Sequence, residues 1–425
     1  MKMTVALVTL IVASLCAAET ISLSPAERSV AQANRLLEKN AKDFEAYNAL
    51  ALALSRRVRE TSDVSFYAQA EIALQKSFAL APDNFDGARI HVWLLLGRHE
   101  FSAALEEARK LSKKMPDDVM VYGFLTDANV ELGNYKEAEA AAQLMLDLRP
   151  GNLPALTRAA YLRELFGDVD GALDLMAMAL ESTPPSEHED AAWILTQMAH
   201  LEWSRGRTVE AEAFLHQALA SFPNYHYALG TLAKVRTLQK RHDEAVTLLK
   251  QRYQAAPHAE NLYDLAEAEQ AAGKATEAKQ AFAEFEQKSL FESKRGDNSN
   301  RELIFYYADY AHEPSKALGI AEQEFLRRHD VYTLDAYAWA LHVNRRDREA
   351  RLQAEAALGV GIHDAKLLWH AGEIALALAD QLAAKGYLQQ ASDLHTLGSE
   401  RAMSLLASMA GTGNQQAGRA ENPSR

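Results

Sequence analysis

The stretch VMVYGFLTDANVELGNYKEAEAAAQLMLDLRPGN, residues 119–152, decides the fold of this chain. Its apolar residues follow a helical pattern up to Gly133 and Asn134, and a second helical pattern then runs to Pro150. Glycine suits the backbone where a helix stops, and proline ends a helix because it cannot continue one. The small Ala138 allows the two helices to approach closely. The stretch therefore predicts one helix–turn–helix unit.

The same unit recurs along the chain, and ten alanines mark one equivalent point in it. Successive markers are 33 to 39 residues apart, and most often 34. They are Ala70, Ala104, Ala138, Ala172, Ala211, Ala245, Ala278, Ala317, Ala350 and Ala384. A period near 34 residues is typical of helix–turn–helix arrays, in which each unit buries its apolar face by stacking on its neighbours. We therefore expect an all-α solenoid of about ten repeats.

Other positions recur together with the markers. Twelve residues after each of the first six markers there is a proline, at 82, 116, 150, 184, 223 and 257. Twelve residues before six of the markers there is a small residue: Ala160, Ala199, Ala233, Ala266, Ala338 and Gly372. This pattern resembles the tetratricopeptide repeat (TPR) family over about residues 44–397. The resemblance implies a right-handed superhelical solenoid whose first helices line a concave groove and whose second helices line the outer surface.

The interruptions of the period suggest four segments. Residues 1–18 resemble a signal peptide, with Lys2, an apolar run and Cys16-Ala17-Ala18 before a cleavage site. Residues 24–292 form a first TPR solenoid segment and residues 298–397 a second one, because the stretch 288–300 between them is polar. Residues 398–425 are expected to form a capping helix and a disordered tail that begins at Gly411.

Composition limits the classes of function. The net charge of −13 argues against the basic stripe that nucleic-acid binding requires. No His-Glu-x-x-His stretch, glycine-rich phosphate loop or Gly-x-Ser-x-Gly elbow occurs, so we expect no metal, no cofactor and no catalytic residues. Cys16 is the only cysteine, and a lipid anchor on it is the alternative to signal cleavage. After cleavage no segment is apolar enough to span a membrane.

All five tryptophans fall on the helical stripe that would face the groove, 8 to 18 residues before a marker alanine. Polar residues accompany them. The candidate partner groove therefore comprises Trp93, Arg158, Trp193, His200, Trp203, Lys234, Trp339, His342 and Trp369. Exposed aromatic residues in a concavity are typical anchors for partners, whereas aromatic stripes at helical spacing also arise from core packing. If the stripe binds a partner, we expect Trp93, Trp203 and Trp339 to be partly exposed.

These observations predict an exported, periplasmic, non-catalytic scaffold that binds a protein or peptide in its concave groove. The alternative is an accessory subunit of an envelope machine, such as an exopolysaccharide exporter or a pilus or secretion assembly. That subunit would contact glycan or bridge other subunits. Tryptophan stacks on sugar rings as readily as it is buried in peptide grooves, so composition does not separate the two.

Overall fold

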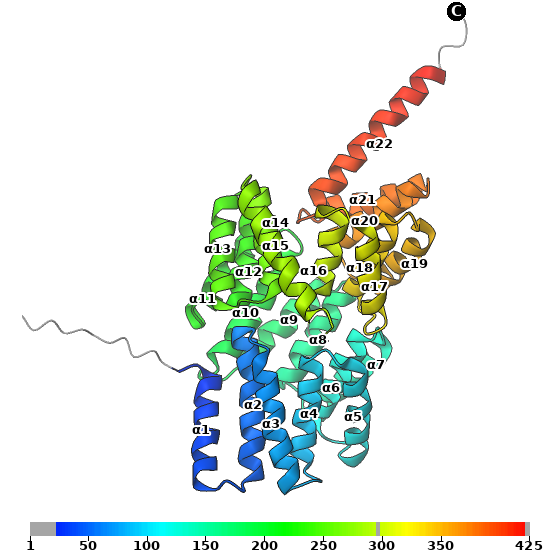
Figure 1. Ribbon diagram of the computed structural model, residues 1–425. Helices are drawn as coiled ribbons and strands as arrows, with labels where there is room; N and C mark the ends of the chain where they lie inside the picture. The colour runs from blue at the N-terminus through cyan, green and yellow to red at the C-terminus, as the bar shows by residue number, and fades with distance from the viewer. Residues whose placement is uncertain (1–22, 295–297, 421–425) are drawn as a thin grey trace, which may run out of the picture.

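The computed structural model describes the backbone of residues 23–294 and 298–420, and the side chains as far as Ala410. The predicted signal peptide, residues 1–18, lies outside the described residues. The described chain is helical throughout, with short turns between helices (Figure 1). None of its helices is both long enough and apolar enough to cross a membrane.

The helices form ten antiparallel pairs between two single capping helices, α1 (Pro25–Lys39) and α22 (Ser399–Ala420). The first helices of the pairs are α2 (Phe44–Thr61), α4 (Phe85–Gly97), α6 (Val119–Glu131), α8 (Leu153–Leu165), α10 (His188–Trp203), α12 (His226–Leu238), α14 (Ala259–Ala271), α16 (Asn300–Phe305) with the π-helical turn η1 (Tyr306–Tyr310), α18 (Val331–Val343) and α20 (Ala365–Ala377). The second helices are α3 (Ser65–Leu80), α5 (Phe101–Lys114), α7 (Tyr135–Leu148), α9 (Val169–Glu181), α11 (Thr208–Ser221), α13 (His242–Ala255), α15 (Ala275–Glu292), α17 (Pro314–Phe325), α19 (Asp347–Leu358) and α21 (Gln381–Asp393). The prediction of an all-α solenoid of about ten repeats is confirmed.

The marker alanines are buried on the second helices of the pairs. All ten are at most 3% exposed. The small residues on the first helices are equally tightly packed, since a Cβ at Gly372 would lie 2.6 Å from the side chain of Leu388. The two sets of small residues let the helix axes approach and fix the register of the repeats.

The solenoid winds until its later repeats touch its earlier ones, so that α17 and α18 lie against α6 and α7 (Figure 1). The His329 amide donates to the Glu131 carbonyl at 2.8 Å, and the Val331 amide donates to the Tyr135 hydroxyl at 3.1 Å. We call this line of contacts, which continues through the turns after α8 and α10, the seam.

Glycines in the turns between paired helices make the seam possible. Gly133, Gly167 and Gly206 have φ values of +74°, +82° and +76°, in the left-handed region that favours glycine. A Cβ at Gly167 would also lie 2.7 Å from the carbonyl oxygen of Gly361, and one at Gly206 would lie 3.0 Å from that of Leu394. These turns thus require glycine both for their backbone conformation and for the approach of another superhelical turn.

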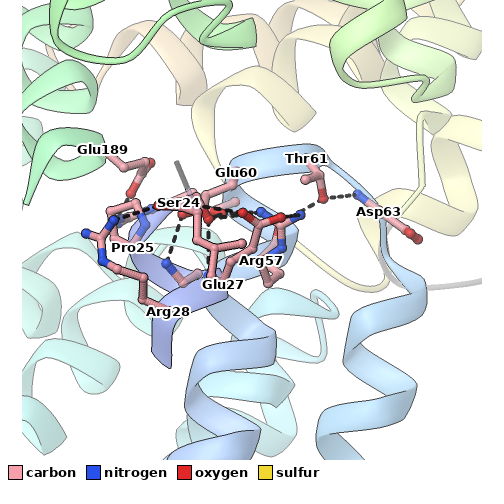
Figure 2. Close-up of polar contacts among 12 residues, drawn as sticks. Ser24, Pro25, Glu27, Arg28, Arg57, Glu60, Thr61, Asp63 and Glu189 are labelled. Carbon is pink, nitrogen blue, oxygen red and sulfur yellow. Dashed lines mark hydrogen bonds and ion pairs between the residues drawn. The ribbon is translucent and has the colours of Figure 1, made fainter. Parts of the chain in front are cut away.

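The start of the solenoid is held by a polar cluster, shown in Figure 2. The Ser24 hydroxyl caps α1 by accepting from the Glu27 amide at 3.1 Å, and it also donates to the Glu60 carboxylate at 2.6 Å. Arg57 forms ion pairs with Glu27 and Glu60. The cluster ties the first turn of α1 to the last turn of α2, and the figure places Glu189 of α10 beside it.

The predicted second segment is bordered by the polar stretch at its start and by a single helix at its end. At its start the hydrophobic core continues across the polar stretch, because Phe282 and Phe285 of α15 share one cluster with Leu303 and Tyr307. Residues 295–297 of that stretch lie outside the described residues, and the predicted boundary between two solenoid segments stays a prediction. At the C-terminus helix α22 covers Ser399–Ala420. The predicted division of residues 398–425 into a capping helix and a disordered tail stays a prediction.

Candidate functional site

The first five repeats form a ring around a cavity of about 560 Å³, which we call the N-terminal cavity. Its wall consists of side chains from α2, α4, α6, α8 and α10, the first helices of these repeats. Ion pairs close the ring: Arg56 of α2 bonds to Glu187 just before α10 at 2.7 Å, and Arg59 pairs with Glu189 and Asp190. The concave surface is therefore bridged here by ion pairs between α2 and the start of α10.

Three predicted groove residues line the N-terminal cavity: Trp93, Arg158 and Trp193. Both tryptophans are partly exposed, as a surface for a partner requires. The Arg158 guanidinium is already bound within the protein. It donates to the Asp127 carboxylate at 2.5 and 2.8 Å and to the Gly123 carbonyl at 3.1 Å. Arg158 thus fixes α8 against α6 and is not available to a ligand.

The second half of the solenoid encloses a larger cavity of about 790 Å³, which we call the C-terminal cavity. It lies between the ends of α10 and α12 on one side and η1, α18 and α20 on the other. Five predicted groove residues border it: His200, Trp203, Lys234, Trp339 and Trp369. The stripe that the sequence predicts as one groove is therefore divided between two cavities.

The prediction that Trp339 is partly exposed is wrong. Trp339 is only 5% exposed, because its ring stacks on His370 with centroids 4.1 Å apart and its Nε1 donates to Asp309 at 2.8 Å. It is a packing residue of which only an edge borders the cavity. His342 borders neither cavity, since its Nδ1 bonds to Asp347 at 2.7 Å and its ring packs on Trp339. The packing alternative thus holds for these two residues.

Other residues of the C-terminal cavity were not found from the sequence. Asp309 and Tyr310 come from η1, a π-helical turn of the kind often found at functional sites. His363 and Lys366 come from the turn before α20 and its first residues. The aromatic run Tyr306-Tyr307-Ala308-Asp309-Tyr310 is visible in the sequence and could have indicated a binding surface. Its place in the wall of the C-terminal cavity, however, depends on the winding of the whole chain.

The acidic groups of the C-terminal cavity are bound to donors of the protein itself. Glu267 accepts from the Tyr310 hydroxyl at 3.0 Å, and burial raises its pKa although Lys366 opposes the rise. Asp364 caps α20 by accepting from two backbone amides. Asp309 accepts from Trp339, as described above. Each of these carboxylates is thus oriented by a donor of the protein itself.

Several donors of the same cavity have no such partner among the described residues. The ammonium groups of Lys234 and Lys366 face aromatic rings, of Trp203 at 5.6 Å and of Phe305 at 3.4 Å, and neither ion-pairs within 4 Å with a described carboxylate. The Nε1 of Trp203 is buried and has no acceptor within the described chain. A buried donor without an acceptor costs about 1–3 kcal/mol. The two ammonium groups in the wall favour a ligand with acceptor oxygens.

A metal site is not apparent in the part of the chain that the structure describes. No group of three or more His, Cys, Asp or Glu side chains there could hold a metal ion. The closest arrangement, His370 with its Nδ1 at 2.8 Å from Asp335, is a fully buried pair packed under Trp339. It stabilises the wall of the C-terminal cavity and does not contact its space.

Comparisons with known proteins agree with this architecture. A family model described as tetratricopeptide repeat matches residues 202–257. No curated protein matches the sequence significantly. Among solved structures, the human IFIT1 dimer with m7Gppp-AAAA is similar over 86% of this chain and 84% of its own, at 14% identity and a TM-score of 0.50.

Two further solved structures are similar over about half of the chain. PilW, a widely conserved type IV pilus biogenesis factor, covers 48% of this chain and 92% of its own, with 15% identity and a TM-score of 0.40. A TPR protein of Thermus thermophilus covers 47% of this chain and 99% of its own, with 20% identity and a TM-score of 0.37. At such identities a likeness shows the fold alone. The family match, the 34-residue period and the stacked helix pairs together support the interpretation of this chain as a tetratricopeptide-repeat protein.

Proposed function

We propose that this protein is a non-catalytic scaffold that binds a protein partner by holding a peptide segment of it in the C-terminal cavity. The observation that carries the proposal is Trp203. Its ring is partly exposed in the cavity, Lys234 lies over that ring, and its indole N–H has no acceptor among the described residues. A peptide offers both an apolar side chain for the ring and carbonyl oxygens for the donors.

The proposal includes export, which rests on residues 2–18 and therefore on sequence alone. A periplasmic location fits a mature chain without cysteine, since Cys16 precedes the expected cleavage site. The net charge of −13 disfavours nucleic acid as the ligand. Glycan remains the alternative ligand, because the same tryptophans stack on sugar rings.

Selection of peptides from a displayed random library against the full mature chain tests the proposal. The Trp203→Ala variant should bind the selected peptides more weakly by about 1–4 kcal/mol, the range of anchor residues, with little loss of stability. Isothermal titration calorimetry gives the affinities and thermal melting gives the stability.

The matched control is Trp93→Ala, which removes the same side chain from the N-terminal cavity and should leave these affinities unchanged. Selected peptides that bind wild type and Trp203→Ala equally would place the partner outside the C-terminal cavity. A library without any binder, together with oligosaccharides that quench Trp203, would favour the glycan alternative.

A further inference from the structure

The wall of the N-terminal cavity is mostly apolar. Around it stand Leu52, Trp93, Met120, Val130, Leu153, Pro154, Tyr161, Trp193 and Ile194. Leu52 is 37% exposed, and Trp93, Met120 and Trp193 are partly exposed to the cavity's space. A volume of about 560 Å³ falls within the range of cavities that take small molecules.

The charged residues at this wall neutralise one another. Arg158 is bound to Asp127, and Arg56 and Arg59 are bound to the acidic start of α10. Burial raises the pKa of Glu131, and Arg328 opposes that rise. Since these groups already have partners, the free energy for a ligand would come from covering the apolar side chains.

Two polar atoms at the edge of this cavity lack a hydrogen-bond partner among the described residues, the Nε of Arg59 and the Oε2 of Glu131. The Nε of Arg59 is buried and has no acceptor among the described residues, although the far end of the same guanidinium pairs with Glu189. Arg56 and Arg59 also line a smaller cavity of about 300 Å³, which His226, Tyr227 and Asn261 border from the other side. At Arg59 of α2, an apolar cavity and an unsatisfied donor are therefore adjacent.

We propose that the N-terminal cavity binds an amphiphile with a single hydrocarbon chain, whose oxygen-bearing head group accepts from Arg59. The chain covers Leu52, Trp93 and Trp193, and the head group lies where the two cavities share the Arg59 side chain. This site is independent of the peptide site proposed above, because the two share no lining residue. Its occupation would join α2 to α10 at the point where the ring of repeats closes.

Dodecanoic acid, titrated below its micelle concentration into the full mature chain by isothermal titration calorimetry, tests the proposal. Wild type should show saturable binding at one site. Leu52→Trp fills the cavity from a half-exposed position and should weaken that binding by about tenfold or more. Leu382→Trp, the same change at a leucine that is 85% exposed and lines neither cavity, is the matched control and should bind as wild type does.

The head group is tested with Arg59→Lys, which keeps the positive charge but removes the Nε donor. This variant should bind dodecanoic acid more weakly while its affinity for 1-dodecanol changes less, because a carboxylate is the stronger acceptor. Equal losses for the two ligands would overturn the assignment of the head group to Arg59.

The remaining outcomes decide whether the N-terminal cavity binds an amphiphile. Absence of saturable binding to wild type, or equal affinities of wild type and Leu52→Trp, would overturn the proposal. Trp203→Ala should bind dodecanoic acid normally, so failure here and failure of the peptide site are distinguishable. Circular dichroism melting of each variant verifies that it is folded, and Leu52→Val is the milder second variant, expected to bind dodecanoic acid with unchanged stoichiometry.

Discussion

At the scale of single residues, His226 connects two helices that are far apart in the sequence. Its Nε2 donates to the Arg59 carbonyl at 3.0 Å, so the first residue of α12 touches the last turns of α2. The side chain is 2% exposed, and this burial lowers its pKa to about 4. Arg252 and His258 lower the pKa further, while the Arg59 carbonyl and Glu260 raise it. His226 is therefore neutral at pH 7.

The lowered pKa of His226 predicts a loss of stability in mild acid. Between about pH 6.5 and 4 the unfolded chain binds a proton at this residue and the folded chain does not, so stability falls as the pH falls through that window. From pH 7 to pH 5 this residue should cost about 1–2 kcal/mol. Thermal melting at both pH values should therefore show a smaller acid loss for His226→Gln than for wild type. His216→Gln, at a surface position, should show the wild-type loss.

The contacts of Glu189 show which features of single residues could not be predicted from the sequence. Helix α10 begins at His188, and the acidic Glu189 and Asp190 in its first turn suit the N-terminal end of a helix dipole. The contacts of Glu189 with Arg59 and with the Tyr225 hydroxyl at 2.6 Å were not predicted. Local spacing identifies a helix start, but it carries no signal for a partner that lies 130 residues earlier in the chain.

At the scale of elements, periodicity predicted most helix pairs because each unit repeats the same small residues and the same turn. The exception is α2, which continues to Thr61 through Arg56 and Arg59 and is the longest of the first helices. These residues have adequate helix propensity, and their ion pairs with the start of α10 hold the extra turn in place. The extra turn of α2 thus supplies the ion pairs that join α2 to α10 beside the N-terminal cavity.

Close packing of the pairs predicts a sharp difference between two alanines of α7. Ala138 is fully buried against its partner helix, whereas Ala140, two residues later, is exposed. Ala138→Leu should lower the free energy of unfolding by about 1–3 kcal/mol through overpacking. Ala140→Leu should change it by less than about 0.5 kcal/mol. Urea denaturation of the two variants measures the difference, and equal values would contradict the register of the repeats.

At the scale of the whole molecule, the seam makes distant repeats depend on one another. Most solenoids are stabilised by contacts between neighbouring repeats alone. In this protein the turn at Gly167 also touches Gly361, and the turn at Gly133 touches His329. Sequence periodicity predicts the neighbour contacts but not the seam, because the winding angle accumulates small differences over several repeats.

Two glycines at equivalent positions of their repeats allow the contribution of the seam to stability to be measured. Gly167 and Gly273 both have positive φ values, so alanine strains the backbone at either position. A Cβ at Gly273 meets nothing within 4 Å, whereas one at Gly167 meets the Gly361 carbonyl. Gly167→Ala should therefore lose about 1–3 kcal/mol more stability than Gly273→Ala in urea denaturation. Equal losses would show that the seam contributes nothing to stability.

The seam also constrains how such a chain changes over generations. An open array gains or loses single repeats with little harm, because each new unit meets an equivalent neighbour. Here the residue facing Gly133 is His329, and the residue facing Gly167 is Gly361, which are 196 and 194 positions further along the chain. Duplication or deletion of one repeat between such partners would bring the wrong turn opposite each glycine along the whole line. The number of repeats in one superhelical turn is thus inherited as a unit, while repeats beyond the seam are free to vary.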